Sequence, residues 1–173
     1  MPATIYSGLA RWGYDSDMAT SLNHVSIGAS DLEASARFYV EVLGLERIPS
    51  PNFGTPTCWL RAGDLQLHLF ERSVTAPTYH HFGLTVQDFE GVYRKVEQLG
   101  LMDTTTMGAG IRELPDNSVQ MYLRDPAGNL VEVDFPDSSH LDSRVIGSLP
   151  KLADEYPQSE ENRRASLFLG PGR

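Results

Sequence analysis

With 173 residues, the chain is long enough for one domain or for two small fused units, and either can bury a real core. A net charge of -9 argues against nucleic acid as a partner, because neutralising phosphates requires clustered Lys and Arg. No stretch approaches the ~20 apolar residues that span a bilayer, and residues 1–20 lack the basic start and apolar run of a signal peptide. We therefore expect a cytoplasmic protein that binds a small molecule rather than a membrane or nucleic acid.

The first half of the chain predicts a strand, a helix and three further strands. Alternating apolar residues indicate a strand over 22–29, after which Ser30-Asp31 can cap a helix with apolar residues at helical spacing up to Leu43. Gly44 can end that helix. The three strands expected after it span residues 45–48, 57–62 and 64–71.

The second half repeats this order. A strand is expected over 80–86, followed by a helix over 88–99 that ends at Gly100. Three strands then follow, at residues 118–124, 130–135 and, more weakly, within 101–117. A four-stranded mixed sheet that curls around a site is expected from each half.

The two ends of the chain differ in composition from this repeat. We interpret residues 1–20 as an N-terminal extension. Polar and charged residues dominate 137–173, which suggests a tail packed on the core or on a partner subunit, with a short helix near 158–168. Disorder of this tail is the alternative.

Each half carries a histidine near the start of its first strand and a potential metal ligand in the centre of its last. The first-strand residues are His24 and His81, 57 positions apart, and the last-strand residues are His68 and Glu132. Because side chains alternate along a strand, all four lie on the more polar face. Two or three of the histidines with Glu132 would give the open-sided 2-His-1-carboxylate pattern of iron sites, and Mn, Ni, Zn or Co also suit these donors.

The other histidines and the cysteine receive different assignments. His80 has the wrong parity to join the four candidates, and His140 lies outside the repeat, so both are expected at the surface or behind the site. Cys58 is the only cysteine, which rules out an intrachain disulfide, and it is expected to be a buried structural thiol.

Two motifs resemble the vicinal oxygen chelate superfamily, which includes glyoxalase I, bleomycin-resistance proteins, fosfomycin-resistance enzymes, methylmalonyl-CoA epimerase and extradiol dioxygenases. One combines Asn23-His24-Val25 and Asp31-Leu32 with Phe-Tyr-Val-Glu-Val-Leu-Gly-Leu at 38–45, and the other runs from Tyr122 to Glu132. The resemblance covers about 22–136. It implies an α+β fold in which two tandem βαβββ modules, 21–75 and 78–136, form a cupped mixed β-sheet around a metal site.

The same resemblance implies a divalent metal held by four ligands, a small-molecule substrate and a homodimer. The four ligands are His24, His68, His81 and Glu132. Similarity to a bacterial subgroup with Trp-Leu-Arg and Leu-His-Leu-Phe-Glu in its third and fourth strands implies that Trp59 and Phe70 line the pocket. We add Ser26, which shares a strand face with His24.

Similarity to glyoxalase I implies metal-assisted proton transfer next to a carbonyl, with Glu132 as ligand and base. Those enzymes usually have a carboxylate where His68 stands and a glutathione-binding arginine where Gly28 stands, which argues against glutathione as the substrate. Similarity to extradiol dioxygenases implies an Fe(II) triad of His24, His81 and Glu132, with Tyr122 nearby. However, the acid/base histidine that those enzymes carry before the tyrosine is missing here, and no potassium- or phosphonate-binding loop of the fosfomycin type is recognisable.

We therefore expect a divalent-metal-dependent enzyme that acts on a small oxygenated molecule by bidentate chelation. Lyase or isomerase chemistry like that of glyoxalase I is favoured, with Glu132 and Tyr122 as catalytic residues. One alternative is a ring-cleaving dioxygenase that uses Fe(II). A second alternative is a non-catalytic binder of drug-like molecules, as in bleomycin resistance.

Overall fold

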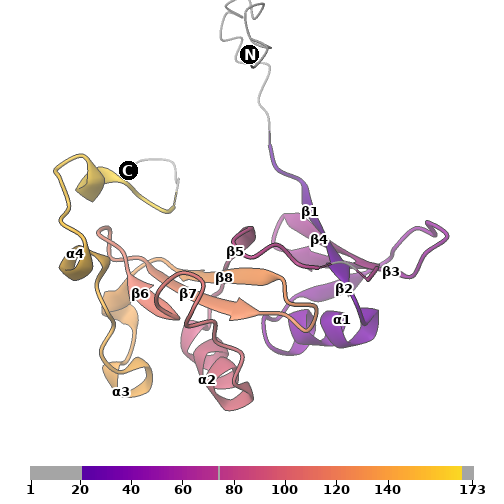
Figure 1. The fold of residues 1–173 in the computed structure, drawn as a ribbon, viewed down its shortest axis with the longest axis horizontal. Coiled ribbons are helices and arrows are strands. Elements are labelled where there is room, and N and C mark those ends of the chain that lie inside the picture. The colour runs from indigo at the N-terminus through magenta and orange to yellow at the C-terminus, as the bar shows by residue number, and fades with distance from the viewer. Residues whose placement is uncertain (1–20, 74, 169–173) are drawn as a thin grey trace, which may run out of the picture.

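The computed structural model describes residues 21–73 and 75–168, which contain two four-stranded mixed sheets side by side (Figure 1). The first module consists of β1 (His24–Ala29), α1 (Leu32–Glu41), β2 (Glu46–Ile48), β3 (Thr57–Ala62) and β4 (Leu65–Glu71). The second consists of β5 (His81–Thr85), α2 (Phe89–Leu99), β6 (Ile111–Glu113), β7 (Val119–Arg124) and β8 (Leu130–Phe135). The predicted α+β fold of two tandem βαβββ modules with cupped sheets is confirmed.

The two sheets have the same topology. The strand order is β1-β4-β3-β2 in the first and β5-β8-β7-β6 in the second. In each, the module's first strand runs parallel to its last, and the other neighbours are antiparallel. The last strand of each module therefore lies inside the sheet, whereas β1 and β5 lie at an edge.

The helices of the two modules begin in the same way. The carboxylates of Asp31 and Asp88 each accept a hydrogen bond from the backbone N–H three residues later, at 2.8 and 2.9 Å. Gly100 ends α2 in the left-handed conformation, with φ 63°, and Gly44 adopts φ 76° shortly after α1. Asp31 and Gly100 bound their helices as expected, whereas α1 ends at Glu41 with Val42 as its C-cap, two residues before the expected Gly44. Helices α1 and α2 lie on the same side of their sheets (Figure 1).

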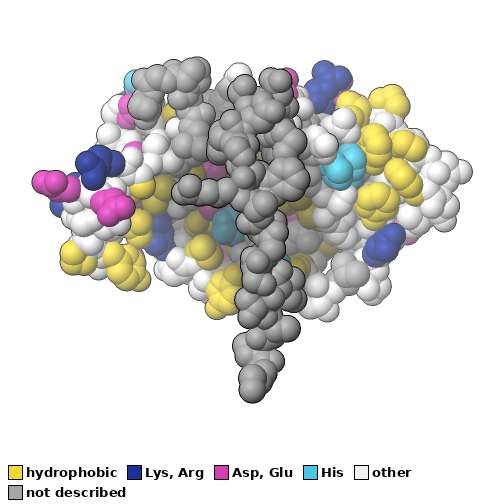
Figure 2. All heavy atoms as spheres, turned by 90° about the horizontal axis from the view of Figure 1, so that it is seen from above, with side chains coloured by type: hydrophobic (Ala, Val, Ile, Leu, Met, Phe, Trp, Pro, Cys, Tyr) yellow, Lys and Arg dark blue, Asp and Glu magenta, His cyan; other side chains and the backbone are white. Residues whose placement is uncertain are grey.

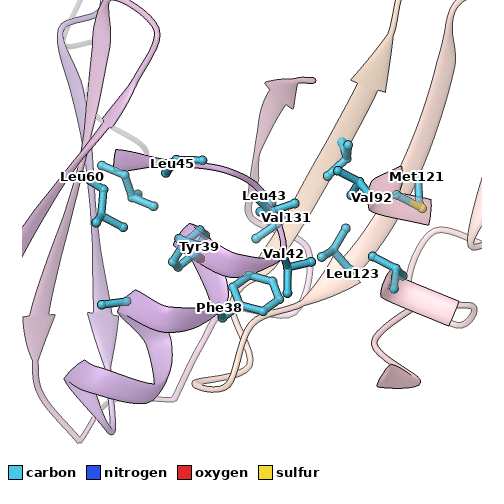
Figure 3. Packing of buried hydrophobic residues seen from close by; sticks show 14 of the residues in the cluster. Phe38, Tyr39, Val42, Leu43, Leu45, Leu60, Val92, Met121, Leu123 and Val131 are labelled. Atoms are coloured by element: carbon cyan, nitrogen blue, oxygen red, sulfur yellow. The ribbon is translucent and has the colours of Figure 1, made fainter. Parts of the chain in front are cut away.

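One cluster of buried apolar side chains spans both modules. Phe38 and Tyr39 of α1, together with Val42 at its C-terminal cap, lie between the first sheet and Leu123 and Val131 of the second (Figure 3). Burying each side chain of this size contributes roughly 1.5–3 kcal/mol. Cys58 is a free thiol in the same cluster, as expected.

The turn between β7 and β8 ties the modules together. Asp125 is 4% exposed, and one of its carboxylate oxygens accepts a hydrogen bond from the Tyr39 hydroxyl of α1 at 2.9 Å. The side-chain amide of Asn129 donates both to Asp125, at 2.8 Å, and to the carbonyl oxygen of Gly28 in β1, at 2.9 Å. The Asp-Pro-x-Gly-Asn motif therefore has a structural role: its polar groups join the second module to the first.

Arg124 joins the segment between the modules to the second sheet. Its guanidinium donates to a carboxylate oxygen of Asp103 at 2.7 Å and to the carbonyl oxygen of Thr78 at 2.9 Å. Burial alone would raise the pKa of Asp103, but hydrogen bonds from Thr106, Thr105 and Arg124 outweigh it and hold that pKa well below its usual range. Asp103 is therefore a carboxylate in the folded protein at neutral pH.

The described part of the tail, 137–168, packs against the second module (Figure 1). Glu113 of β6 accepts hydrogen bonds from Ser138 and Lys151, both at 2.8 Å. The tail contains η1 (Ser138–His140), α3 (Ser143–Ile146), α4 (Leu152–Glu155) and η2 (Asn162–Arg164), so the helical element described after residue 157 is a short 3-10 turn. None of the described helices combines the length and the apolar character needed to cross a membrane. The N-terminal extension expected over 1–20 lies outside the described residues.

Candidate metal centre

The second module brings two of the candidate ligands together. Nε2 of His81 in β5 lies 3.2 Å from a carboxylate oxygen of Glu132 in β8. Nδ1 of His81 is 2.9 Å from the carbonyl oxygen of Tyr79. Because a carbonyl oxygen can only accept, Nδ1 carries a proton, and Nε2 is the ring nitrogen that faces the carboxylate.

Glu132 is 5% exposed, and its second oxygen is also fixed in place. That oxygen accepts a hydrogen bond from the side-chain amide of Gln120 in β7 at 2.6 Å. The Tyr122 hydroxyl reaches the amide oxygen of Gln120 at 3.3 Å, and the Tyr122 ring stands edge-on to His81, with centroids 5.8 Å apart. Burial, and then the neighbouring Glu132, raise the pKa of Tyr122, so its hydroxyl stays protonated and can donate a hydrogen bond.

A second carboxyl group, Asp134, lies on the same face of β8 as Glu132. Asp134 is 5% exposed, and its Oδ1 atom has no hydrogen-bond partner among the described residues. Burial and the neighbouring Glu132 raise the pKa of Asp134 to about 8. Gly83 of β5 leaves room for this group, because a Cβ there would lie 2.7 Å from Oδ2 of Asp134. Sequence reasoning did not select Asp134 or Gly83, although the alternation along β8 placed Asp134 beside Glu132.

The first module brings together the other two candidates in a different way. The rings of His24 in β1 and His68 in β4 are stacked, with centroids 4.4 Å apart and planes 16° apart. The other face of His68 stacks on Trp59 of β3, at 4.0 Å and 4°. Burial, and then the neighbouring His24, lower the pKa of His68, so this ring is neutral at pH 7.

Further aromatic side chains continue this face of the first sheet. Phe53 lies 6.0 Å from Trp59 and 5.4 Å from Phe70 between ring centroids, and the guanidinium of Arg72 lies 5.7 Å from the Phe70 ring. Phe53 is 51% exposed. Figure 2 shows hydrophobic side chains next to a histidine on its right-hand half, the half that holds the first sheet. Phe53 lies in a loop, where strand parity gave no reason to select it.

The four predicted ligands thus form two pairs. Within residues 21–73 and 75–168, no group of three or more His, Cys, Asp or Glu side chains is arranged to hold one ion. Ser26 is exposed on the same face of β1 as His24, while His80 and His140 are exposed residues in neither pair.

A groove of about 1370 Å³ runs between the two modules. Its walls include the edge strands β1 and β5, from which half-buried apolar side chains project: Val25, Ile27, Phe82 and Leu84. His81 also lines it. Both edge strands therefore expose apolar residues to the same space, and each has only one strand neighbour among the described residues.

The pair in the second module fits a divalent metal. Two ligand atoms each about 2.1 Å from one ion, at nearly a right angle, lie about 3 Å apart. The His81 and Glu132 atoms are separated by 3.2 Å. A neutral imidazole and a carboxylate that face each other repel unless a proton or a cation lies between them, and imidazole with carboxylate suits Fe, Mn, Ni, Zn or Co.

These features are those of a known class of proteins. The family model for the Glyoxalase/Bleomycin resistance protein/Dioxygenase superfamily matches residues 21–133. The chain belongs to this superfamily.

Individual relatives differ in their named activities. The chain is 31% identical over 124 residues to "Glutathione transferase FosA" of Serratia marcescens, covering 67% of this chain and 81% of that one. It is 26% identical over 129 residues to "Glyoxylase I 4" of Arabidopsis thaliana, covering 69% and 72%.

Solved structures give the same result for the fold. "Oxidase ChaP-H2" is 29% identical, with a TM-score of 0.56 over 70% of this chain and 98% of that one. A fosfomycin resistance protein, FosX, from Listeria monocytogenes, solved with Mn(II) and 1S,2S-dihydroxypropylphosphonic acid, is 17% identical, with a TM-score of 0.58 over 70% and 96%. The latter likeness is one of fold alone.

Proposed function

We propose that this protein is a divalent-metal-dependent enzyme that binds a small oxygenated molecule through two of its oxygens and acts on it by lyase or isomerase chemistry. The observation that carries the proposal is the approach of His81 Nε2 to the Glu132 carboxylate at 3.2 Å, with His81 Nδ1 already paired to a carbonyl oxygen. A histidine that donates its other ring N–H to an oxygen is the usual arrangement of a metal ligand. The Mn(II) bound to FosX, which shares the fold, supports a metal of this kind.

The metal site requires a further ligand, which we assign to His24 of a second copy of the chain. His24 lies on β1 and His81 on β5, and each of these strands is an edge strand that lines the groove between the modules. In a twofold dimer, β1 of each copy can approach β5 of the other, which creates two equivalent sites. Each site would combine His24 from one copy with His81 and Glu132 from the other.

The residues around Glu132 are suited to moving a proton. A bound divalent ion supplies a Lewis acid that polarises a carbonyl or hydroxyl oxygen. Glu132 is held at one oxygen by Gln120, so its position is fixed as a ligand and as a base for a proton next to a carbonyl. The protonated Tyr122 hydroxyl can donate a hydrogen bond to an oxygen on which negative charge develops.

The aromatic face of the first sheet supplies the wall for the rest of the substrate. Trp59 and Phe70 flank Phe53, and Ser26 offers a hydroxyl on the same face as His24. Such a wall favours a substrate that carries an apolar or planar group next to its chelating oxygens.

A second candidate function is oxygen-dependent chemistry with Fe(II). It is favoured by the 29% identity to a protein named an oxidase and by a ligand set of two histidines and one carboxylate. Metal analysis combined with oxygen uptake separates the two candidates. Bound iron with substrate-dependent oxygen consumption would exclude the lyase or isomerase.

The metal site is tested by substituting neighbouring histidines. His81→Ala should abolish tight binding of Mn²⁺ or Co²⁺ in calorimetric titration while circular dichroism shows an intact fold. His80→Ala is the matched control, because His80 is exposed and precedes β5, outside both ligand pairs. Unchanged metal stoichiometry in His81→Ala would refute the site.

Sharing of the site between copies is tested by mixing two variants that each bind no metal. In a heterodimer of His24→Ala and His81→Ala, one site lacks both histidines and the other retains both. Mixing under conditions of subunit exchange should therefore restore one metal per heterodimer. If the ligands came from one chain, mixing would restore nothing.

A further inference from the structure

The histidines of the site differ in which ring nitrogen is free. Nδ1 of His24 pairs with the side-chain oxygen of Asn23, and Nδ1 of His81 pairs with the carbonyl oxygen of Tyr79. Since amide and carbonyl oxygens only accept, both rings carry a proton on Nδ1, so neither of these pairings occupies Nε2, and Nε2 of His81 faces Glu132. These two residues occupy equivalent positions at the start of β1 and β5, and both are prepared to bind a metal through the same atom.

His68 has the opposite arrangement. Its Nε2 atom lies 2.9 Å from the side-chain oxygen of Gln66, two residues earlier on the same face of β4. Nε2 of His68 is therefore a hydrogen-bond donor in this arrangement, and its lone pair lies on Nδ1. Nothing in this pairing directs His68 Nε2 toward a shared ion.

The orientation of the rings also separates His68 from a shared metal. A metal ion lies in the plane of the imidazole that binds it, about 2 Å from the nitrogen. The planes of His24 and His68 are only 16° apart, with centroids 4.4 Å apart, so no point within that bond length lies in both planes. As placed, the two rings cannot bind the same ion.

What the stack does provide is a fixed position for His24. His24 is exposed on an edge strand, and its ring has His68 on one face. His68 is in turn 8% exposed and stacked on Trp59 at 4.0 Å, so it cannot turn without displacing the indole. In this stack of three rings, Trp59 and the buried His68 therefore hold His24, the proposed ligand at the edge of the sheet, in a fixed orientation.

We propose that His68 is a positioning residue that orients His24 by stacking, and not a ligand of the metal. This inference rests on the proposed metal site and reduces its ligands to His24, His81 and Glu132. It is consistent with a histidine at the place where glyoxalase I enzymes usually have a carboxylate, because a carboxylate could not stack between Trp59 and His24.

The test compares two substitutions of His68. His68→Phe keeps a flat ring in the stack but has no nitrogen, whereas His68→Ala removes the ring. We expect Mn²⁺ affinity, measured by calorimetric titration, to stay within about threefold of wild type in His68→Phe and to fall about 10–100-fold in His68→Ala, as for other groups that orient a ligand. The visible absorption spectrum of bound Co²⁺ should be unchanged in His68→Phe, because the ligand set is unchanged.

Loss of metal from His68→Phe to the extent seen in His24→Ala would overturn the inference and leave the proposed function intact. Failure of the wild-type protein to bind metal would instead overturn the proposed function, and this inference with it. A measurement on the wild-type protein covers the case in which His68→Phe does not fold. In an NMR titration with Zn²⁺, the Nε2 resonances of His24 and His81 should shift strongly, and a comparable shift at a His68 ring nitrogen would overturn the inference.

Discussion

The two modules share strand order, register and helix capping, yet the faces that they turn away from their helices differ in chemistry. In the first module Trp59 lies opposite His68 across β3 and β4, and in the second Tyr122 lies opposite Glu132 at the equivalent place. Two residues along the last strand, Phe70 of the first module corresponds to Asp134 of the second. One face is a row of neutral rings, and the other holds buried carboxyl groups.

This difference shows that two modules with the same backbone topology can contribute different chemical groups to one site. Stacked rings need only contact, which a sheet face provides at no electrostatic cost. Buried carboxylates need hydrogen-bond donors and room, which Gln120 and Gly83 supply in the second module. In the proposed site, the first module therefore orients the ligand His24 and supplies the aromatic wall of the substrate pocket. The second module holds the negative charge that attracts a cation.

The largest effect is expected from removing that charge. Glu132→Gln keeps the shape of the side chain and its contact with Gln120 but leaves a neutral amide in front of His81. Because groups that only orient ligands already change metal affinity 10–100-fold, loss of the carboxylate should lower Mn²⁺ affinity by more than about 100-fold. Calorimetric titration measures this, with Glu160→Gln in the exposed tail as control. A similar loss in Glu160→Gln would point to net charge rather than to the site.

Equivalent positions on β1 and β5 allow a direct comparison of the two faces. Gly83 and Ser26 occupy the same place in the two modules, opposite Glu132 and His68. Gly83→Val forces a side chain against the buried Asp134 and should lower the free energy of unfolding by roughly 1–3 kcal/mol. Ser26→Val adds a side chain of similar bulk at an exposed position and should change it by less than about 0.5 kcal/mol.

Urea unfolding of both variants measures the difference. Equal destabilisation would show that any bulk on an edge strand is unfavourable. It would also show that the carboxyl groups of the second face need no special room.

Most of the fold could be predicted because its signals are local. Alternation over 57–62 and 130–135 gave those strands their observed limits, and the caps at Asp31 and Asp88 follow from side-chain chemistry next to the chain. The weak strand expected within 101–117 is the three-residue β6, which is too short to show a period.

The site was less predictable because it depends on contacts between strands. Parity placed His68 on the correct face, but it does not reveal that Trp59 fills the space beside it. Nor does it reveal which ring nitrogen is free, since that depends on the oxygen of Gln66. The motif that contains Asp125 was likewise interpreted only as a mark of family resemblance. Its contacts with the first module, which give it a structural role, could not be predicted from it.

Removing the hydrogen bond from Tyr39 to Asp125 tests whether the two sheets depend on the contacts that join the modules, which we call the junction. Tyr39→Phe leaves the buried carboxylate without one donor and should lower the free energy of unfolding by about 1–2 kcal/mol in urea titration. Tyr93→Phe in α2 is the control, because it removes the hydroxyl of another tyrosine that packs against the core but takes no part in the contacts of Asp125. Hydrogen exchange measures the loss of structure in each sheet separately. Unequal loss in the two sheets would show that the modules can unfold separately.

The smallest change in the free energy of unfolding is expected from removing the acidic partners of two arginines near the ends of β3 and β7. Arg61 pairs with Glu46 at 3.6 Å, and both side chains are more than half exposed, whereas Arg124 holds Asp103 at 2.7 Å. Because the folded-state pKa of Asp103 lies below its unfolded value of about 4, its charge stabilises the fold above that value and loses this contribution as the pH falls below it. Asp103→Asn should therefore lower the free energy of unfolding by about 1 kcal/mol at pH 7, a value kept small because Arg124 is still 27% exposed. The difference in free energy of unfolding between Asp103→Asn and wild type should become smaller below about pH 5. Glu46→Gln should show no measurable difference from wild type at any pH. A gap for Asp103→Asn that stayed constant from pH 7 to pH 3 would assign the effect to the shape of the side chain rather than to its charge, and the electrostatic contrast between the modules would then be confined to Glu132 and Asp134.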